Sequence, residues 1–278
     1  TWRSTSSDVA LTCDLALDAY KSGKKQSGNF GVVVERVVID KDGDFARGEY
    51  VTVTRAAIYP VCAEEKDYFI RTLAYEIKSV IDGIFPDKNF FALVAGLGNG
   101  FTSSDALGKK VVDKISVTRG ADVDGINEVC AYPLGVAGIT GVDSFEVITA
   151  LNRQLNPDII ICVDALCAIK RERICRAYQL SSAGIRAGGG TENPSDKKIN
   201  FKSMGVPVIA IGVPTVISAQ RAVKEIIGEN KRADEYFSGG DMFVTLRDID
   251  QAVNECAEVV SSALNLALSP ETYFLHNS

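Results

Sequence analysis

Histidine is almost absent from this sequence of 278 residues, which contains only His276, the third residue from the end. A Ser-His-Asp triad or a Cys-His dyad needs an imidazole base that a rigid neighbour holds in place. A chain terminus is a poor place to hold such a group. Histidine-dependent hydrolysis and His-rich metal sites are therefore disfavoured. A hydrolase with this sequence would have to use carboxylates, or an unusual arrangement of Lys, Cys or Thr.

Long apolar runs and paired cysteine motifs are also missing. No apolar stretch reaches the roughly 18 to 20 residues that a membrane-spanning helix needs, and the polar start TWRSTSSDVA has no signal-peptide region. The seven cysteines are odd in number, form no Cys-x-x-Cys motif and include several in apolar runs, such as Ile161-Cys162-Val163. Buried thiols in a reducing compartment fit this pattern better than disulfides or zinc. We expect a cytoplasmic protein.

Positive charge is in deficit, because the formal net charge is -6. Nucleic acids and anionic membranes favour partners with clustered Lys and Arg, so we expect neither as a partner. What is present is an ordinary globular composition, with 46% hydrophobic and 24% charged residues. Such a chain can bury one large core and need not divide into two domains.

Apolar runs alternate with segments of helical spacing along most of the chain. The continuous apolar runs at 158–163 and 207–213 are typical of strands buried on both faces. Two β-branched runs at 31–40 and 49–55 predict an N-terminal β-hairpin. The sequence therefore predicts an α/β fold, a single three-layer domain with a mainly parallel mixed sheet flanked by helices. Further strands are expected at 90–95 and 129–132, and helices at 63–84, 105–114, 143–155, 219–227 and 246–268.

Two Asp-Ala-Leu elements each follow a predicted strand. Asp105 comes six residues after the apolar run 93–99, and Asp164 follows the run 159–163 directly. The carboxyl edge of an open α/β sheet is where ligands and catalytic groups collect. Two carboxylates close together there titrate as a coupled pair, so that one donates a proton while the other activates water. This pair could hydrolyse an amide without histidine.

Each aspartate also has a purely structural interpretation. An Asp after a strand is often a helix N-cap, which accepts hydrogen bonds from the first turn of the next helix. Asp105 fits this interpretation well, since Ser103-Ser104-Asp105 opens a predicted helix. The local sequence leaves both alternatives open.

Glycines near these elements suggest close backbone approaches. The segment Gly96-Leu-Gly98-Asn99 lacks the full G-x-G-x-x-G spacing, and no Walker lysine follows, so a nucleotide site is disfavoured. A turn with positive φ, next to a substrate chain, explains it better. Gly138 and Gly141 allow the backbone to approach either a substrate or a neighbouring strand. Backbone N–H groups at these places could polarise a scissile carbonyl.

A recognisable series of motifs runs from about residue 13 to residue 220. In order, these are Asp14-Leu-Ala-Leu-Asp18, Gly96-Leu-Gly-Asn99, Asp105-Ala-Leu-Gly108, Val117-Thr-Arg119, Gly135-Val-Ala-Gly-Ile-Thr-Gly141, Pro157 to Leu166, Ser182-Ala-Gly-Ile185 and Gly205 to Thr215. With these motifs the chain resembles the germination proteases of spore-forming bacteria. The last stretch and the ordered pair of Asp-Ala-Leu elements make the resemblance specific.

The resemblance implies an endopeptidase of atypical aspartic type, with Asp105 and Asp164 as its essential residues. It implies a fold similar to that of hydrogenase-maturation proteases, no cofactor, small acid-soluble spore proteins as substrates, homotetramers, and a place in the forespore or spore core. The family is made as a zymogen that cuts itself at an acidic-Leu-Ala sequence. Asp14, Leu15 and Ala16 match that sequence. We therefore expect a pro-like segment 1–13, a peptidase domain 14–278, and an uncleaved or partly trimmed form.

The chain departs from the family pattern at three places. Ser103-Ser104 stands where the family has Thr-Pro, Gly184 to Gly190 lacks an expected His-Pro, and Cys167 to Lys170 replaces an Ala-Arg-Ser-like stretch. These changes leave substrate preference open. Two alternatives follow: a metal-dependent maturation-type peptidase, whose paired carboxylates hold a divalent ion, or a catalytically silent paralogue that binds spore proteins. We predict no metal ligands, and the sequence does not assign acid and base.

Overall fold

The computed structural model describes residues 15–20, 23–43, 45–86, 89–121, 126–186, 198–228 and 242–269. The strands are β1 Lys24–Ser27, β2 Val33–Ile39, β3 Gly48–Thr54, β4 Phe91–Leu97, β5 Glu128–Gly135, β6 Ile159–Ala168, β7 Ala177–Ser181, β8 Ile185–Arg186, β9 Lys198–Ile199, β10 Val208–Ser218 and β11 Phe243–Val244. The α-helices are α1 Ala16–Ala19, α2 Ala63–Asp82, α3 Leu107–Val112, α4 Ala137–Thr140, α5 Ser144–Leu155, α6 Phe201–Met204, α7 Ala219–Ile227 and α9 Ile249–Leu268. Short 3-10 helices are η2 Asn29–Gly31, η3 Ser103–Asp105 and η4 Arg171–Arg173.

One mixed sheet organises the described residues. Its strand order is β1-β2-β3-β7-β10-β6-β4-β5, and β11 pairs with β10 to bring the total to nine, while β8 and β9 form a separate pair. The strands β10, β6, β4 and β5 are parallel to one another. The strands β1, β2, β3 and β7 join through antiparallel pairs. The predicted mixed α/β sheet and the N-terminal hairpin are confirmed.

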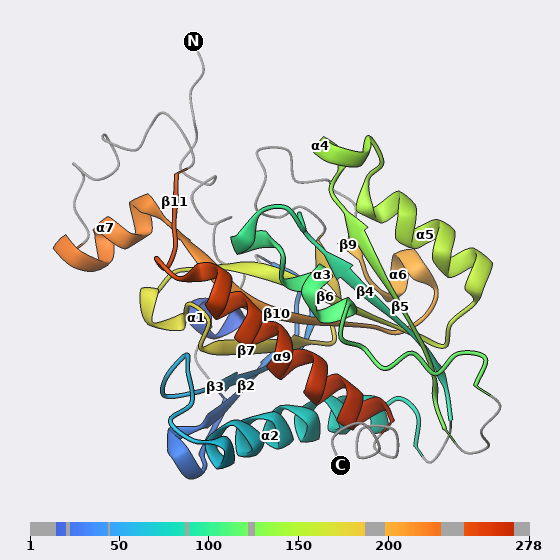
Figure 1. Cartoon of the computed structure of the whole chain (residues 1–278), viewed down its shortest axis with the longest axis horizontal. Helices are drawn as coiled ribbons and strands as arrows, with labels where there is room; N and C mark the ends of the chain where they lie inside the picture. Colours follow the sequence, from blue (N-terminus) through green and yellow to red (C-terminus); the bar gives the residue numbers. More distant parts are fainter. Residues whose placement is uncertain are drawn as a thin grey trace.

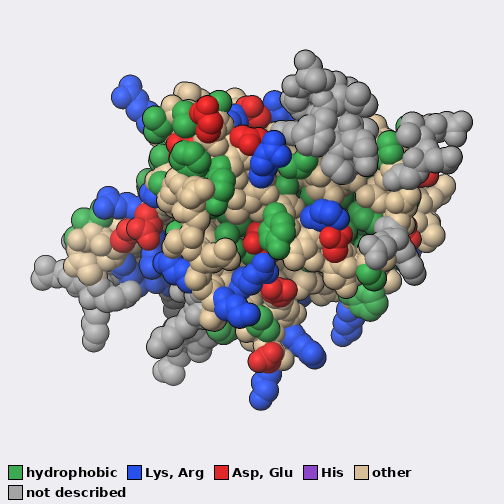
Figure 2. Space-filling view, turned by 90° about the horizontal axis from the view of Figure 1, so that it is seen from below, with side chains coloured by type: hydrophobic (Ala, Val, Ile, Leu, Met, Phe, Trp, Pro, Cys, Tyr) green, Lys and Arg blue, Asp and Glu red, His purple; other side chains and the backbone are tan. Residues whose placement is uncertain are grey.

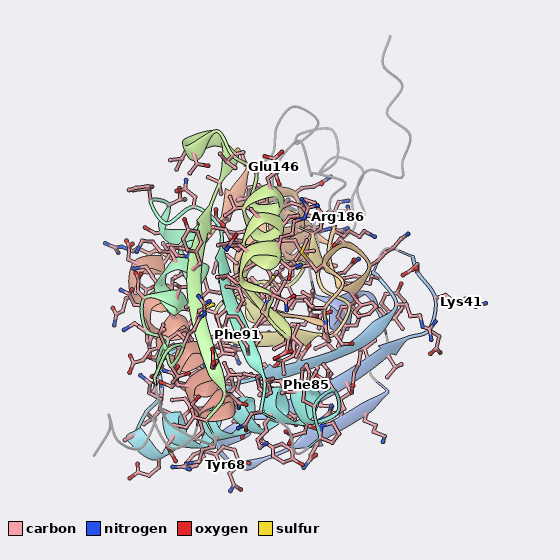
Figure 3. The ribbon with its side chains drawn as sticks, turned by 90° about the vertical axis from the view of Figure 1, so that its right-hand side faces the viewer. Lys41, Tyr68, Phe85, Phe91, Glu146 and Arg186 are labelled. Carbon is pink, nitrogen blue, oxygen red and sulfur yellow. The ribbon has the colours of Figure 1, made fainter. Side chains whose placement is uncertain are left out.

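Both faces of the sheet are covered by helices, and β6 shows why. Ile161 and Val163 face a core shared with α2, α3 and α9, whereas Ile160 and Cys162 face a second core shared with α5 and α6. A strand buried on both faces needs apolar residues at successive positions, which is the continuous run seen in the sequence. Figure 1 shows α2 and α9 on one side of the sheet, and Figure 3 shows α9 and α5 on opposite sides of β5. The fold therefore has three layers.

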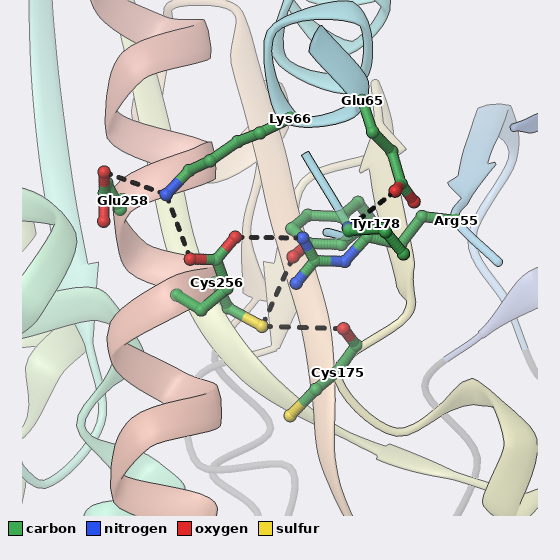
Figure 4. Close-up of polar contacts among 9 residues, drawn as sticks. Arg55, Glu65, Lys66, Cys175, Tyr178, Cys256 and Glu258 are labelled. Atoms are coloured by element: carbon green, nitrogen blue, oxygen red, sulfur yellow. Dashed lines mark hydrogen bonds and ion pairs between the residues drawn. The ribbon is translucent and has the colours of Figure 1, made fainter. Parts of the chain in front are cut away.

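Helix α9 ties the layers together through apolar and ionic contacts. Its side chains Val260 and Leu264 are fully buried, and burying each aliphatic side chain is worth roughly 1.5–3 kcal/mol. Arg55, just after β3, contacts Glu255 of α9 at 3.2 Å, and Lys66 of α2 contacts the same carboxylate at 3.0 Å (Figure 4). One carboxylate therefore links three elements that are far apart in the sequence.

The solvent side of α2 is charged. The pairs Arg71–Asp67 and Lys78–Asp82 lie four residues apart on this helix, and such exposed pairs stabilise a helix only slightly. On the face drawn in Figure 2, basic and acidic side chains are interspersed.

Among the residues that the structure describes, no helix is both long and apolar enough to span a membrane.

Most predicted elements lie near their expected bounds, but four differ. The strands predicted at 158–163 and 207–213 continue to Ala168 and Ser218, and the helix predicted at 105–114 divides into η3 and α3. Strand β7 was not predicted. It has only five residues, Ala-Tyr-Gln-Leu-Ser, in which apolar and small or polar side chains alternate. That alternation is too short to stand out in a sequence, although the strand sits at the centre of the sheet.

Candidate active site

The strand order places a topological switch point between β4 and β6. After β4 the chain crosses through α3 to β5, and after β5 it crosses through α5 to β6 on the other side of β4. The two crossover helices pack on opposite faces of the sheet. At such a point the connections leave in opposite directions, so a crevice opens at the carboxyl ends of the strands. Asp105 follows β4 and Asp164 lies in β6, so both belong to this edge.

Asp105 is held by the loop that precedes it. The backbone N–H of Asn99 donates to Asp105 Oδ2 at 2.6 Å. Gly98 has a φ of 95°, and a Cβ at this position would lie 2.3 Å from the Asp105 carbonyl oxygen. Only glycine fits both the positive φ and this contact. The Asn99 side chain closes the loop, because its Nδ2 donates to Thr102 Oγ1 at 3.0 Å. The predicted positive φ is confirmed for Gly98 but is wrong for Gly96, which lies in β4, and for Gly100.

The environment of Asp105 favours its protonated form. Burial raises the pKa of this carboxyl above the ordinary value, and the hydrogen bond from the Asn99 N–H opposes that shift in part. A carboxylate loses hydration when it is buried, so its charged form becomes less stable than in water. Asp105 is therefore a better proton donor near neutral pH than an ordinary aspartate.

Neither aspartate is a helix N-cap, so the capping interpretation is wrong for both. The N-cap of α3 is Ala106, and Asp105 accepts its hydrogen bond from Asn99, behind it in the chain. Asp164 was expected just beyond its strand, but β6 continues through it to Ala168, so no α-helix starts there. Asp164 Oδ1 accepts from the N–H of Ala165 at 2.9 Å. Both carboxylates lie where a structural cap is not needed.

The two Asp-Ala-Leu elements lie against each other because residue 108 is glycine. A Cβ at Gly108, which follows the first element, would lie 2.2 Å from the Leu97 carbonyl oxygen and 2.7 Å from that of Val163. Val163 is the residue before Asp164. A Cβ at Gly96 would lie 2.3 Å from the Gly108 carbonyl oxygen. Gly96 and Gly108 therefore let α3 pack directly on β4 and β6, which brings the first element against the second.

Gly138 and Gly141 lie at the same end of the sheet, in and after α4, but contact nothing closely. No atom of the described residues lies within 4 Å of a Cβ built at either position, and Gly141 ends α4 with a φ of 73°. Within the described part of the chain, neither glycine therefore approaches a neighbouring strand. Their role in binding a substrate stays a prediction, as do those of Gly96, Gly98 and Asn99.

The predicted processing sequence begins outside the described residues, since Asp14 precedes them. Leu15 is fully buried against Leu166 and Ala177. The N–H of Ala16 donates to Gln179 Oε1 at 2.8 Å. Leu166 belongs to the second Asp-Ala-Leu element, so this segment reaches the same region as Asp164. Gln179 was missed from the sequence because β7 was missed.

No group of three or more His, Cys, Asp or Glu side chains that could hold a metal ion occurs within the described ranges. The fold and the site together define an α/β protein with two aspartates at the switch point of a mixed sheet.

Comparison with known proteins identifies the family. A sequence model described as Germination protease matches residues 19–229. A germination protease of Clostridium tetani is 31% identical over 91% of this chain and 88% of its own length. Those of Clostridium perfringens and Priestia megaterium are 35% and 33% identical over 80% and 81% of this chain, and 78% and 66% of their own lengths. The chain belongs to the germination protease family, which is a family of peptidases.

Among solved structures, the chain is similar to the [NiFe] hydrogenase maturation protease HycI from Thermococcus kodakarensis KOD1. The TM-score is 0.33 and the identity 15%, over 67% of this chain and 99% of that one. This likeness is too weak to define the fold, which rests on the strand pairings described above.

Proposed function

We propose that this germination protease homologue is an endopeptidase of aspartic type, in which Asp105 and Asp164 carry out the hydrolysis. The observation that carries this proposal is their common place at the switch point, where Gly108 packs the first Asp-Ala-Leu element against Val163. Neither carboxylate serves as a cap. The proposed substrates are small acid-soluble spore proteins, as the family resemblance implies.

The reaction needs one acid and one base. The raised pKa of Asp105 suits the acid, which protonates the leaving amide nitrogen. Asp164 is then the base that takes a proton from water as the water oxygen attacks the carbonyl carbon. The C–N bond breaks as the nitrogen takes the proton of Asp105. One proton of the water ends on the Asp164 carboxyl, and the other stays on the new carboxyl group of the product. We further propose that a backbone N–H near Gly98 or Gly138, at the same end of the sheet, polarises the carbonyl.

Single replacements test these roles. Asp105→Asn and Asp164→Asn are each expected to lower the rate of spore-protein cleavage by at least about a hundredfold, the usual contribution of a positioned acid or base. Asp113→Asn, on the exposed end of α3, is the matched control. Cleavage is measured by mass spectrometry of the products. Full activity in either of the first two variants would rule out the mechanism, and loss of wild-type activity on chelation would favour the metal-dependent alternative.

The remaining family properties are proposed with the same function. We infer a zymogen that cuts itself before Leu15, a homotetramer, and a place in the spore core. The Asp164→Asn variant should keep its full N-terminal segment, as read by intact mass, while the wild type loses it. Sedimentation equilibrium measures the oligomer directly, and a monomer at micromolar concentration would contradict the tetramer.

A further inference from the structure

One row of paired residues runs across the sheet from Asp164. Asp164 in β6 pairs with Gly212 in β10, and Gly212 pairs with Gln179 in β7. Residues paired directly across strands share a face of the sheet. Neighbouring strands are about 4.8 Å apart, so the backbones at Asp164 and Gln179 are about 10 Å apart. The side chain between them is missing, because residue 212 is glycine.

The bare backbone at Gly212 is covered by Leu166. A Cβ at Gly212 would lie 2.4 Å from Leu166 Cδ1. Leu166 is two residues beyond Asp164 in the same strand, so the two side chains share a face and their Cα atoms are about 6.6 Å apart. The floor between Asp164 and Gln179 is therefore an apolar patch made by a leucine side chain.

The described N-terminal segment reaches this floor at Leu15, the residue before helix α1. Leu15 has φ -98° and ψ 112°, which is strand-like backbone. Its side chain packs on Leu166 and Ala177 with no exposed surface. Ala16, also fully buried, packs on the same face of the sheet further away, against Val37 and Tyr50. The segment is thus closest to Asp164 at Leu15 and then runs away from it.

Gln179 supplies the polar anchor. Its side chain is buried, and its Oε1 accepts the N–H of Ala16 at 2.8 Å. A buried amide oxygen needs a donor, and a peptide N–H one residue after a leucine supplies it whatever the rest of the sequence is. The leucine pocket selects a side chain, and Gln179 fixes where the backbone lies. Together they can recognise a Leu-Xaa unit in which Xaa is small.

We propose that Leu166, Ala177 and Gln179 form a binding seat for a leucine followed by a small residue, and that Leu15-Ala16 is its resident occupant. The seat rests on the proposed peptidase function, and the leucine in it packs on Leu166, two residues from Asp164. Gln179 is a positioning and specificity-determining residue. Hydrolysis of the bond before Leu15 would add the water oxygen to the carbonyl carbon of Asp14 and a proton to the nitrogen of Leu15.

A binding experiment tests the seat without needing catalysis. The probe is a fluorescently labelled peptide with the sequence of residues 9–20 and Cys13 replaced by Ser, and its affinity for the full chain is followed by anisotropy. Leu15→Ala in the protein empties part of the seat, so the probe should bind about tenfold more tightly or better than to the wild type. A probe with Gly in place of its own Leu15 should lose that gain.

A second variant removes the anchor and keeps the shape. Gln179→Met should weaken probe binding to the Leu15→Ala chain by about tenfold and raise KM for peptide cleavage, with kcat changed less. Gln251→Met, at an exposed position of α9, is the matched control. Thermal melting checks that each variant is folded.

The outcomes separate the seat from the proposed function. Equal probe affinity for wild-type, Leu15→Ala and Leu15→Ala/Gln179→Met chains would overturn the seat, even if the wild type cleaves spore proteins. The expected pattern of affinities, with no cleavage by the wild type, would support the seat and overturn the peptidase. A gain in affinity on Leu15→Ala that the glycine probe shares would also overturn it, because leucine would not be recognised.

Discussion

At the scale of single residues, the site depends on where the oxygens of Asp105 point. Its carboxylate accepts from the N–H of Asn99 rather than from the helix that follows. The hydrogen bond fixes the side chain, while burial makes its charge costly. A group whose ionisation costs free energy in the folded state changes stability with pH in a defined direction.

The first prediction concerns that direction. The pKa of Asp105 is higher in the folded than in the unfolded chain, so the folded state binds more protons between the two values. Binding of this proton by the folded state stabilises the protein. The stabilisation is fully present below about pH 3.9, the pKa in the unfolded chain, and is lost as the pH rises through the pKa in the folded chain. Asp105→Asn removes the cost, so the Tm of the variant relative to the wild type should be highest near neutral pH and fall towards pH 4.

Melting curves from pH 4 to pH 8 check this prediction. Asp82→Asn, at the exposed end of α2, controls for the loss of one negative charge. A difference in Tm between Asp105→Asn and the wild type that stays constant across this range would show that burial does not raise the pKa of Asp105.

At the scale of elements, α3 begins two residues after Asp105 and packs directly on the sheet only because two glycines allow it. Gly96 and Gly108 let the helix backbone lie against β4 and β6, closer than any side chain would permit. Both glycines were noted in the sequence, Gly96 in the motif that begins with it and Gly108 at the end of Asp105-Ala-Leu-Gly108. The periodicity of the sequence does not show that the two glycines face one another. The contact is a property of the strand order, which brings β4 beside β6.

The second prediction follows from this packing. In Gly108→Ala the new Cβ meets the backbone of Leu97 and Val163, which cannot move away easily. We expect a loss of about 1–3 kcal/mol in the free energy of unfolding, together with lower peptidase activity. Gly138→Ala, inside α4 with open space around it, should instead gain about 0.5–1 kcal/mol. Urea denaturation of both variants measures the two changes, and a neutral result for Gly108→Ala would contradict the packing.

The sequence predicted where strands and helices lie along the chain better than it predicted which of them lie side by side. The continuous apolar run before Asp164 predicted β6 because burial on both faces removes any polar alternation. Both aspartates were found because each follows such a run. Gln179 and Leu166 were not associated with Leu15, because their contact depends on pairing between β7, β10 and β6. Strand pairing joins residues that are distant in the chain, so no local pattern records it.

At the scale of the whole molecule, Glu255 holds α9, α2 and the end of β3 together. Its two oxygens contact Arg55 and Lys66, and the Arg55 side chain is only 4% exposed. Arg55 also lies 5.5 Å from the ring centroids of Phe69 and Tyr178. The charge of a buried guanidinium is stabilised by its carboxylate partner, because water does not reach the site to solvate the charge when that partner is removed.

The third prediction tests that dependence. Glu255→Gln leaves the buried charge of Arg55 without its counter-ion and is expected to cost about 3–5 kcal/mol in the free energy of unfolding. Asp82→Asn breaks an exposed pair with Lys78 and should change it by no more than about 0.5 kcal/mol. Guanidinium denaturation compares the two, and equal effects would show that the contact with Glu255 contributes little.

The contact between Ala16 and Gln179 joins residues 163 positions apart in the chain, and this separation has a consequence in time. A ribosome makes about 5–20 residues per second, so Leu15 and Ala16 emerge roughly 10 to 30 s before the strand that receives them. Until β7 exists, Leu15 lacks its contact with Ala177 and Ala16 lacks its hydrogen bond to Gln179. By the time it docks, β4, α3 and β6 have already been synthesised, and with them both aspartates. Any cut that a chain makes in its own N-terminal segment at this seat therefore has to come after translation of the residues that make the cut.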